Sequence, residues 1–282
     1  MVLLRRTVLL RYLLLLAILA LLLFISSSWL RKCFVYWLFQ AKPPLAPEGW
    51  LEAGGPLPLI KDCPGKLFQA WRLLLYLKSS LSDDDDVLLE PYLQSWDQLL
   101  KFMESLGTMA SFFSQKVKEK VVLIQQLSLK HSAEAHGIRG PAYRSVRSMV
   151  EMELKAGAVD FSHRTDSGCR TLLRLHRSLL WLKLMLEGLA EGPDADGQYR
   201  TPGELSRDAY MVALAPHHPW VLRQAAEFVF LALPDRQYFL QLVCVQNQQE
   251  AVPILRIIIH ALTLVHTRTQ QILAEHGMLE LP

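Results

Sequence analysis

The 282-residue chain lacks most of the short signals that mark catalytic and metal-binding proteins. Its four cysteines include no CxxC pair, which leaves a zinc site without support. It has no glycine-rich phosphate loop, no GxSxG elbow and no HExxH helix. Its one asparagine, Asn247, is not part of an N-glycosylation acceptor. Acidic and basic groups converge nowhere in the pattern, so we expect neither an enzyme nor a cofactor.

An excess of positive charge is also absent from most of the chain. The net charge of +3 arises at the N-terminus, where residues 1–47 contain six basic residues and no acidic one. The rest of the chain contains 24 basic residues and all 27 acidic ones, which gives it a net charge of −3. We therefore expect no nucleic-acid partner, and any bound anion must meet a local cluster of basic side chains.

A long apolar run is the most prominent feature that is present. Nineteen uncharged residues, from Tyr12 to Leu30, lie between basic residues and are just long enough to span a bilayer. A basic start, a short apolar stretch and small residues also fit a cleavable signal peptide. The aromatic residues that follow favour a retained anchor. They are Trp29, Phe34, Tyr36 and Trp37.

Both interpretations predict a membrane-associated protein, but they leave the side of the membrane open. Three arginines before the run, against two basic residues after it, favour a cytoplasmic N-terminus and a lumenal or external domain. The cysteines argue for the opposite side, because they form no dense framework.

The rest of the chain divides into a linker and one domain. Residues 42–65 contain six prolines and four glycines, which is typical of a semi-extended linker. We therefore divide the chain into an anchor or signal segment at 1–41, a linker at 42–65 and a domain at 66–282. In the domain, apolar residues recur with helical period and no strand-like alternation stands out, which predicts an all-α fold. The predicted helices are Leu67–Ser80, Leu88–Leu106, Met109–Gln126, Tyr143–Lys155, Cys169–Leu189, Pro202–Leu214, Pro219–Leu231, Asp235–Val243 and Val252–Glu275.

One predicted helix begins with three arginines on a single face. Arg170, Arg174 and Arg177, here called the arginine face, have i, i+4 and i+7 spacing. Positive side chains in the first turns of a helix oppose its macrodipole. A bound anion would gain from the guanidinium groups and from the free N–H groups of the helix start. The alternative is pairing with nearby acidic residues, namely Asp160, Asp166 or Glu187.

A second predicted helix has two lysines within an apolar stripe. Lys116 and Lys120 have i, i+4 spacing, at which like charges repel. If they converge with the arginine face, four or five cations lie over an apolar cavity, which suits a lipid with a phosphate head. The alternative is a pair of lysines that snorkel at the border of a core helix.

Stretches of this sequence closely resemble the glycolipid transfer protein family, over about Leu73–Pro282. The matching stretches are Val87–Tyr92, Ser105–Thr108, Ser167–Arg170 with Arg174, His176 and Arg177, Trp181, Leu186–Leu189, His218–Val221 and Ala274–Pro282. The resemblance implies a two-layer all-α sandwich that admits lipid chains between its helices. It also implies non-enzymatic transfer of a lipid between membranes. With its added apolar segment, the chain looks like a membrane-associated paralogue within the family.

The resemblance also implies roles for individual residues. In the family a lysine and two arginines bind the phosphate head, and Lys120, Arg170 and Arg174 match them. A histidine donates to the acyl carbonyl of the lipid, and His218 matches it. In the sugar-binding branch a tryptophan stands at the position of Arg174, so the implied ligand is a phosphate lipid such as ceramide-1-phosphate.

Lys116 departs from the family pattern. It stands where the family has an aspartate that accepts from the sphingosine amide, and an ammonium group cannot accept. Glu119 lies near the same side of the helix but would need a shifted lipid pose. A buried, unpaired ammonium costs several kcal/mol unless an anion meets it, which favours a more anionic ligand.

The predicted head-group site is therefore Lys116, Lys120, Arg170, Arg174 and His218. Three functions stay open. The first is a carrier of ceramide-1-phosphate, and the second is a lipid sensor that prefers phosphatidic acid. The third is a membrane-anchored protein-interaction module with a degenerate lipid site.

Overall fold

The computed structural model describes residues 60–134 and 143–282. The predicted membrane segment at 1–41 and most of the predicted linker lie outside these residues. In the described part, one helix is long and apolar enough to cross a membrane, namely Gln248–Glu275. Most of its apolar side chains belong to the main hydrophobic core, as expected for a central helix of a folded domain.

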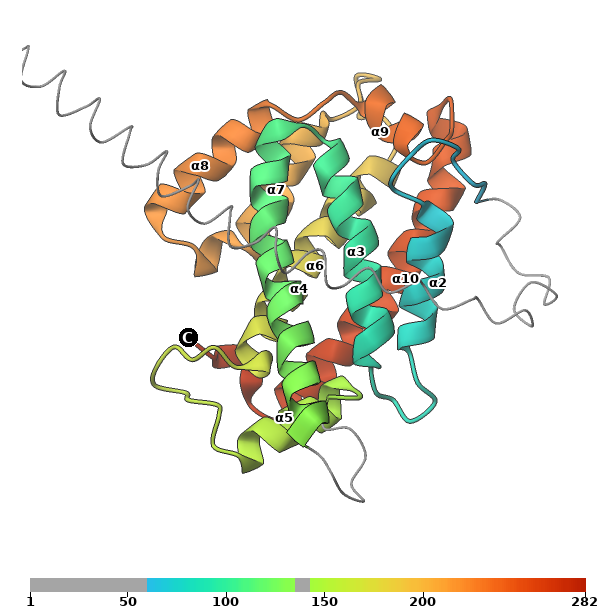
Figure 1. The fold of residues 1–282 in the computed structure, drawn as a ribbon. Helices are drawn as coiled ribbons and strands as arrows, with labels where there is room; N and C mark the ends of the chain where they lie inside the picture. The colour runs from blue at the N-terminus through green and yellow to red at the C-terminus, as the bar shows by residue number, and fades with distance from the viewer. Residues whose placement is uncertain (1–59, 135–142) are drawn as a thin grey trace, which may run out of the picture. The chain divides into compact units, whose positions relative to one another are not determined.

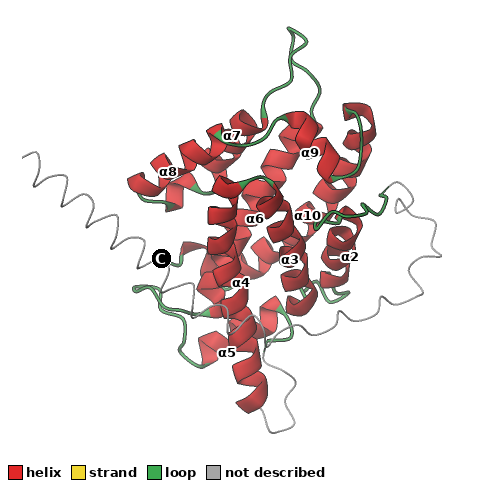
Figure 2. Ribbon diagram, turned by 45° about the horizontal axis from the view of Figure 1, so that its top comes forward, coloured by secondary structure: helices red, strands yellow, loops and turns green. Residues whose placement is uncertain are grey.

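The regular elements of the described residues are helices, which confirms the predicted all-α class there. In chain order they are α2 (Ala70–Ser80), α3 (Leu89–Ser105), α4 (Thr108–Glu134), α5 (Val146–Lys155), α6 (Gly168–Ala190), α7 (Pro202–Ala213), η3 (Ala215–His217), α8 (Trp220–Leu231), α9 (Arg236–Leu242), α10 (Gln248–Glu275) and η4 (Met278–Glu280). Loops connect the α-helices, as Figure 2 shows; η3 lies between α7 and α8, and η4 follows α10.

The helices of the domain are arranged in two layers. In Figure 1, α2, α3 and α4 lie in front of α6 and α10. Helix α6 packs against α4, α7 and α10, while α2 packs against α3 and α10 and so closes the other side. Helix α8 packs on α7 at the edge of the domain in both views (Figures 1 and 2).

Side-chain caps explain where helices begin. Thr201 accepts from the N–H of Glu204, and the Glu204 carboxylate accepts from the N–H of Thr201, which forms a capping box before α7. Pro202 fits the first helical position because its missing N–H would have no partner there. Asn247 caps α10 by accepting from the N–H of Glu250.

The observed helices follow the predicted ones closely, except at four ends. Helix α2 begins at Ala70 rather than Leu67, and α5 begins at Val146 rather than Tyr143, where the Ser145 side chain caps it. Helix α4 continues past Gln126 to Glu134, because Leu127 still packs against the core. Helix α10 begins at Gln248 rather than Val252, because the cap at Asn247 starts it one turn earlier.

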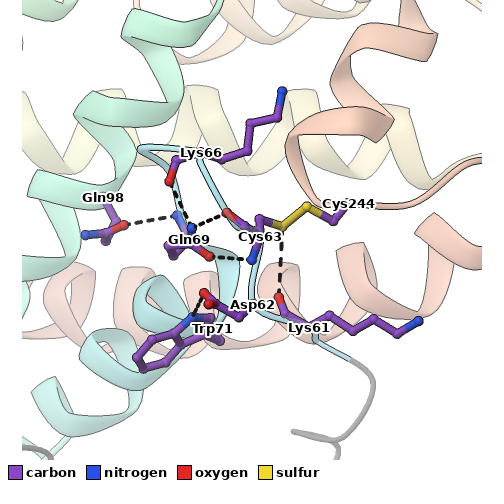
Figure 3. The surroundings of a disulfide bond; sticks show 8 residues. All are labelled: Lys61, Asp62, Cys63, Lys66, Gln69, Trp71, Gln98 and Cys244. Atoms are coloured by element: carbon purple, nitrogen blue, oxygen red, sulfur yellow. Dashed lines mark hydrogen bonds between the residues drawn. A yellow bond between two sulfur atoms is a disulfide. The ribbon is translucent and has the colours of Figure 1, made fainter.

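A disulfide bond joins the segment before α2 to the end of α9. Cys63 and Cys244 are 181 residues apart in sequence, and their Cα atoms are 5.8 Å apart (Figure 3). Ile60 and Cys63 are buried although they belong to the predicted linker, so this stretch packs as part of the domain. The spacing of the cysteines in the sequence did not reveal this bond. Because disulfides persist in oxidising compartments, the bond removes the argument from the cysteines against a lumenal domain.

Candidate functional site

The start of α6 is occupied by a carboxylate of the domain itself. Glu153 of α5 is 2% exposed, and its oxygens accept from the N–H groups of Gly168 and Cys169 at 2.6 and 2.8 Å. The Tyr143 hydroxyl also donates to Glu153, at 2.6 Å. The Ser167 hydroxyl accepts from the N–H of Arg170. Our expectation that a ligand would use free N–H groups at this helix start is therefore wrong.

Glu153 also explains how α6 tolerates arginines in its first turns. A negative charge at a helix N-terminus interacts favourably with the macrodipole and offsets the cost of the basic residues. The close approach requires a glycine, because a Cβ at Gly168 would lie 2.9 Å from a Glu153 oxygen and 2.8 Å from the Met149 sulfur.

The acidic residues that could have neutralised the arginine face are engaged elsewhere. Asp160 pairs with His163 at 3.0 Å, and Glu187 pairs with Lys183 at 2.8 Å. Asp166 acts on the arginine face only through its charge, without an ion pair. Among the described residues, no aspartate or glutamate side chain forms an ion pair with the arginine face.

Two members of the arginine face hold the C-terminal segment. The Nε of Arg170 donates to the main-chain oxygen of Pro282, and its Nη1 donates to the Thr165 carbonyl at 3.1 Å. Arg177 donates to the Leu279 carbonyl at 3.0 Å. Arg170 is buried, and both arginines therefore act at least partly as structural anchors.

Arg174 differs from its two neighbours. Its side chain is exposed, and within the described chain its guanidinium has no hydrogen-bond acceptor. Partial loss of water lowers its pKa, and the charges of Arg170 and two further arginines lower it again. A crowded guanidinium without an acidic partner is a favourable place for an anion.

Helix α4 adds Lys120 to the arginine face, and together these residues are here called the basic cluster. The pKa of Lys120 is lowered to about 8, mainly by loss of water and next by the charge of Arg174. Its ammonium donates to the Lys116 carbonyl at 2.8 Å. Lys120 and Arg174 lie near each other across the packed pair α4 and α6, so one of the two lysines meets the condition of convergence with the arginine face.

Lys116 is placed differently from Lys120, which lies one turn further along α4. Its side chain is 58% exposed and pairs with Glu119 at 3.2 Å. It is therefore neither buried nor unpaired, and the premise that it demands a more anionic ligand does not hold. Its direct ion pair is with Glu119, while its charge lowers the pKa of Lys120 by less than the charge of Arg174 does.

His218 lies beside the basic cluster and is oriented by a tyrosine. Its Nδ1 is 2.9 Å from the hydroxyl of Tyr210, which is itself buried in α7. Burial lowers the pKa of His218, and the charge of Lys120 is the next cause, so the ring is neutral. If the tyrosine donates to Nδ1, the single ring proton is on Nε2, which then serves as a hydrogen-bond donor.

Sequence reasoning missed Glu153 and Tyr210 as contributors to this site. Each is an ordinary helical residue in the sequence pattern, and its partner is recognised only once the helices have packed.

His176 is near the arginine face in sequence but has a structural role. It is 3% exposed, stacks on His266 of α10 with ring centroids 4.0 Å apart, and contacts Gln270. Burial lowers the pKa of His176 to about 3 and that of His266 to about 4. This neutral pair links α6 to α10 inside the core.

An apolar cavity lies further along α6. It has a volume of about 30 Å³, and every lining residue is aliphatic or aromatic. The walls come from α2 with the segment before it, α3, α6, α9 with its end, and α10. Helix α6 thus carries the basic cluster in its first half and a wall of this cavity in its second half.

The fold is that of a lipid-transfer family. The sequence profile described as glycolipid transfer protein (GLTP) matches residues 87–245. The chain is similar to the ceramide-1-phosphate transfer protein of Homo sapiens, with 39% identity over 74% of this chain and 94% of the relative. It is also 41% identical to the ceramide-1-phosphate transfer protein of Xenopus laevis, over 76% of this chain and 97% of the relative.

Solved structures agree with this assignment. The human ceramide-1-phosphate transfer protein in complex with 2:0 ceramide-1-phosphate matches with a TM-score of 0.66 and 38% identity. The match covers 74% of this chain and 97% of that one. The chain belongs to the glycolipid transfer protein family, and the predicted family resemblance is confirmed.

Proposed function

We propose that the domain binds a phosphate-headed sphingolipid such as ceramide-1-phosphate and carries it between membranes without covalent chemistry. The observation that carries this proposal is Arg174, an exposed guanidinium without an acidic partner in the described chain, beside Lys120. Arginine presents a planar fork that matches phosphate oxygens, and lysine adds a point charge.

In the proposed complex the head group lies between α4, α6 and the start of α8. Arg174 and Lys120 bind the phosphate oxygens, and the Nε2 of His218 donates to the acyl carbonyl. Arg170 contributes its charge while it holds Pro282. The relatives that are named for ceramide-1-phosphate, and the solved complex with this lipid, support this assignment.

The apolar cavity would receive the hydrocarbon chain. At about 0.8 kcal/mol per buried CH₂, sheltering some sixteen carbons offsets about 13 kcal/mol of water exposure. An apolar wall supplies this shelter without any reaction, so the proposed carrier needs no catalytic group.

We further propose that α8 docks on the membrane surface. Trp220 and Leu231, near the two ends of α8, are 66% and 75% exposed, and Val221 and Phe228 between them are also exposed. Such a surface of large apolar side chains is typical of an interaction site. Trp220 lies two residues after His218, so docking there would bring the head-group site next to the lipid surface.

The location of the domain is proposed from its disulfide. Disulfides persist in oxidising compartments, so the Cys63–Cys244 bond supports a domain in the lumen or outside the cell. The apolar run at residues 12–30 would bring it to that membrane system. Protease protection of the full chain in isolated membrane vesicles tests this placement, and digestion before the vesicles are opened would contradict a lumenal domain.

Native mass spectrometry of the full chain purified from cells tests whether it is a lipid carrier. A copurifying phosphate lipid supports the carrier, whereas an empty protein that also fails to take up added ceramide-1-phosphate favours the protein-interaction module.

Lys116 makes phosphatidic acid a second candidate lipid. It is a positive side chain at the edge of the site, where the family pattern has an acceptor for the sphingosine amide. Phosphatidic acid has no such amide. A binding competition between ceramide-1-phosphate and phosphatidic acid, with Lys116→Asp as the matched variant, decides between the two lipids. If the variant binds ceramide-1-phosphate better relative to phosphatidic acid than wild type does, Lys116 shifts selectivity toward phosphatidic acid.

A further inference from the structure

The Cys63–Cys244 disulfide lies next to the apolar cavity. Phe68, shortly after Cys63 in sequence, lines the cavity from the segment before α2. Val243, which directly precedes Cys244, lines it from the end of α9. The bond therefore connects two walls of the same cavity.

Cys63 is fixed to its own wall by a buried amide network, drawn in Figure 3. The Gln69 side chain accepts from the N–H of Cys63 at 2.9 Å and donates to its carbonyl at 2.8 Å. The N–H of Gln69 donates to the Gln98 side chain of α3 at 3.2 Å. Cys63 must consequently move together with the start of α2 and with α3.

The opposite wall, α9, is held to α3 by weaker contacts as well. The rings of Phe239 and Phe102 meet edge to face at 5.9 Å, and Phe102 meets Phe68 in the same way at 5.3 Å. The Tyr238 hydroxyl donates to the Ser105 carbonyl at 2.8 Å. Such contacts can separate and reform, whereas a covalent bond between the walls cannot.

The cavity must widen before it can hold a lipid chain. Its volume of about 30 Å³ leaves room for only about two water molecules. A hydrocarbon chain is far larger, so its entry requires the walls to move apart. A bond across two of these walls limits how far they can separate.

We propose that Cys63 and Cys244 form a specificity-determining clamp, which limits the length of the acyl chain that the cavity admits. This inference rests on the proposed function. With the bond intact, shorter chains are preferred, and with both cysteines as thiols, α9 moves outward and longer chains fit.

The clamp is reversible by ordinary thiol chemistry. Formation joins the two sulfurs, releases two protons and passes two electrons to an oxidising disulfide, which becomes a dithiol. A reducing dithiol breaks the bond by the reverse exchange. Cys244 is an exposed residue whereas Cys63 is fully buried, so a thiolate approaches the bond from the side of Cys244.

The test uses the purified full chain and ceramide-1-phosphate with octanoyl, palmitoyl or lignoceroyl chains in donor vesicles. It compares oxidised wild type, dithiothreitol-reduced wild type and the double variant Cys63→Ser/Cys244→Ser. The matched control is Cys169→Ala, which removes a buried free thiol and leaves the clamp intact. Alkylation of unfolded protein without reductant first shows whether Cys63 and Cys244 are bonded.

We expect the ratio of lignoceroyl to octanoyl lipid bound to rise about tenfold on reduction and in the double variant, as if two more methylene groups were sheltered. The Cys169→Ala control keeps the wild-type ratio. A merely structural disulfide would lower the melting temperature and leave the ratio unchanged, which would overturn the proposal. Free thiols at Cys63 and Cys244 in the untreated protein would overturn it as well.

Hydrogen exchange separates failure of the clamp from failure of the proposed function. Opening of the clamp predicts faster exchange of the α9 amides in the double variant than in Cys169→Ala, with or without lipid. If none of the proteins binds a phosphate lipid but the α9 amides exchange faster in the double variant, the proposed lipid function is wrong, while the disulfide still restricts the movement of the cavity walls. Equal exchange in both proteins contradicts the clamp itself.

Discussion

The lowered pKa of Lys120 makes lipid binding depend on pH in a defined direction. In the free protein this pKa is about 8, because the ammonium has lost water and lies near Arg174. A phosphate between the two side chains favours the charged form of the lysine. Binding should therefore require a protonated Lys120, and affinity should fall as the pH rises through 8.

The size of this effect follows from the same pKa. A group with a pKa of about 8 is about nine-tenths protonated at pH 7 and about one-tenth protonated at pH 9. If the neutral form binds poorly, affinity falls about tenfold over this interval, or about 1.4 kcal/mol. The second ionisation of a phosphate monoester, with a pKa near 6, is nearly complete above pH 7.

The assay is binding to vesicles that contain ceramide-1-phosphate, measured from pH 7 to pH 9 for wild type and Lys120→Arg. The variant stays charged throughout, so its profile shows the titration of every other group. We expect the wild-type affinity to fall about tenfold relative to the variant. Parallel profiles would refute the placement of Lys120 at the phosphate.

Further predictions concern the arginine face, the start of α6 and the core. Arg174→Leu should weaken binding of ceramide-1-phosphate by about 1.5 to 3 kcal/mol, the range for charged hydrogen bonds, while the exposed control Arg256→Leu leaves it unchanged. Equal binding by both variants in a liposome competition would remove the proposed head-group site. Glu153→Gln should lower the free energy of unfolding in urea by about 1.5 to 3 kcal/mol, since it weakens three hydrogen bonds to a buried carboxylate. The exposed neighbour Glu151 is the control, and a loss no larger than that of Glu151→Gln would contradict this role.

The lowered pKa of His176 predicts that the folded protein loses stability in acid. Its folded pKa of about 3 lies below the unfolded value of 6.5, so stability is fully present above pH 6.5 and falls as the pH drops toward 3. Between pH 7.5 and pH 5 this histidine alone should account for about 2 kcal/mol, which His176→Gln should remove from the difference in unfolding free energy. The same fall in both proteins would rule out this source.

The helices could be predicted from sequence because their signals are local. Apolar residues at helical spacing, Thr201 with Pro202 before α7, and Gly168 after Ser167 each report on the next few residues. The shared face of the arginines and the interrupting lysine at 120 are local as well. The approach of Arg174 to Lys120 remained a condition in the sequence analysis, because the packing of α4 on α6 has no local signal.

The parts that could not be predicted depend on residues distant in sequence. The pairing of Cys63 with Cys244 has no local signal, and four cysteines allow several pairings. Glu153 looks like a solvated helix residue until α5 packs beside the start of α6. The hold of Arg170 on Pro282 likewise depends on where the chain returns after α10.

Transfer between vesicles tests the central claim most directly. The compact unit of residues 55–282 is mixed with donor and acceptor vesicles that contain ceramide-1-phosphate, phosphatidic acid or galactosylceramide. Our account predicts transfer of ceramide-1-phosphate, little transfer of galactosylceramide, and loss of activity in Arg174→Leu. Failure to move either phosphate lipid, or transfer that survives Arg174→Leu unchanged, would contradict it.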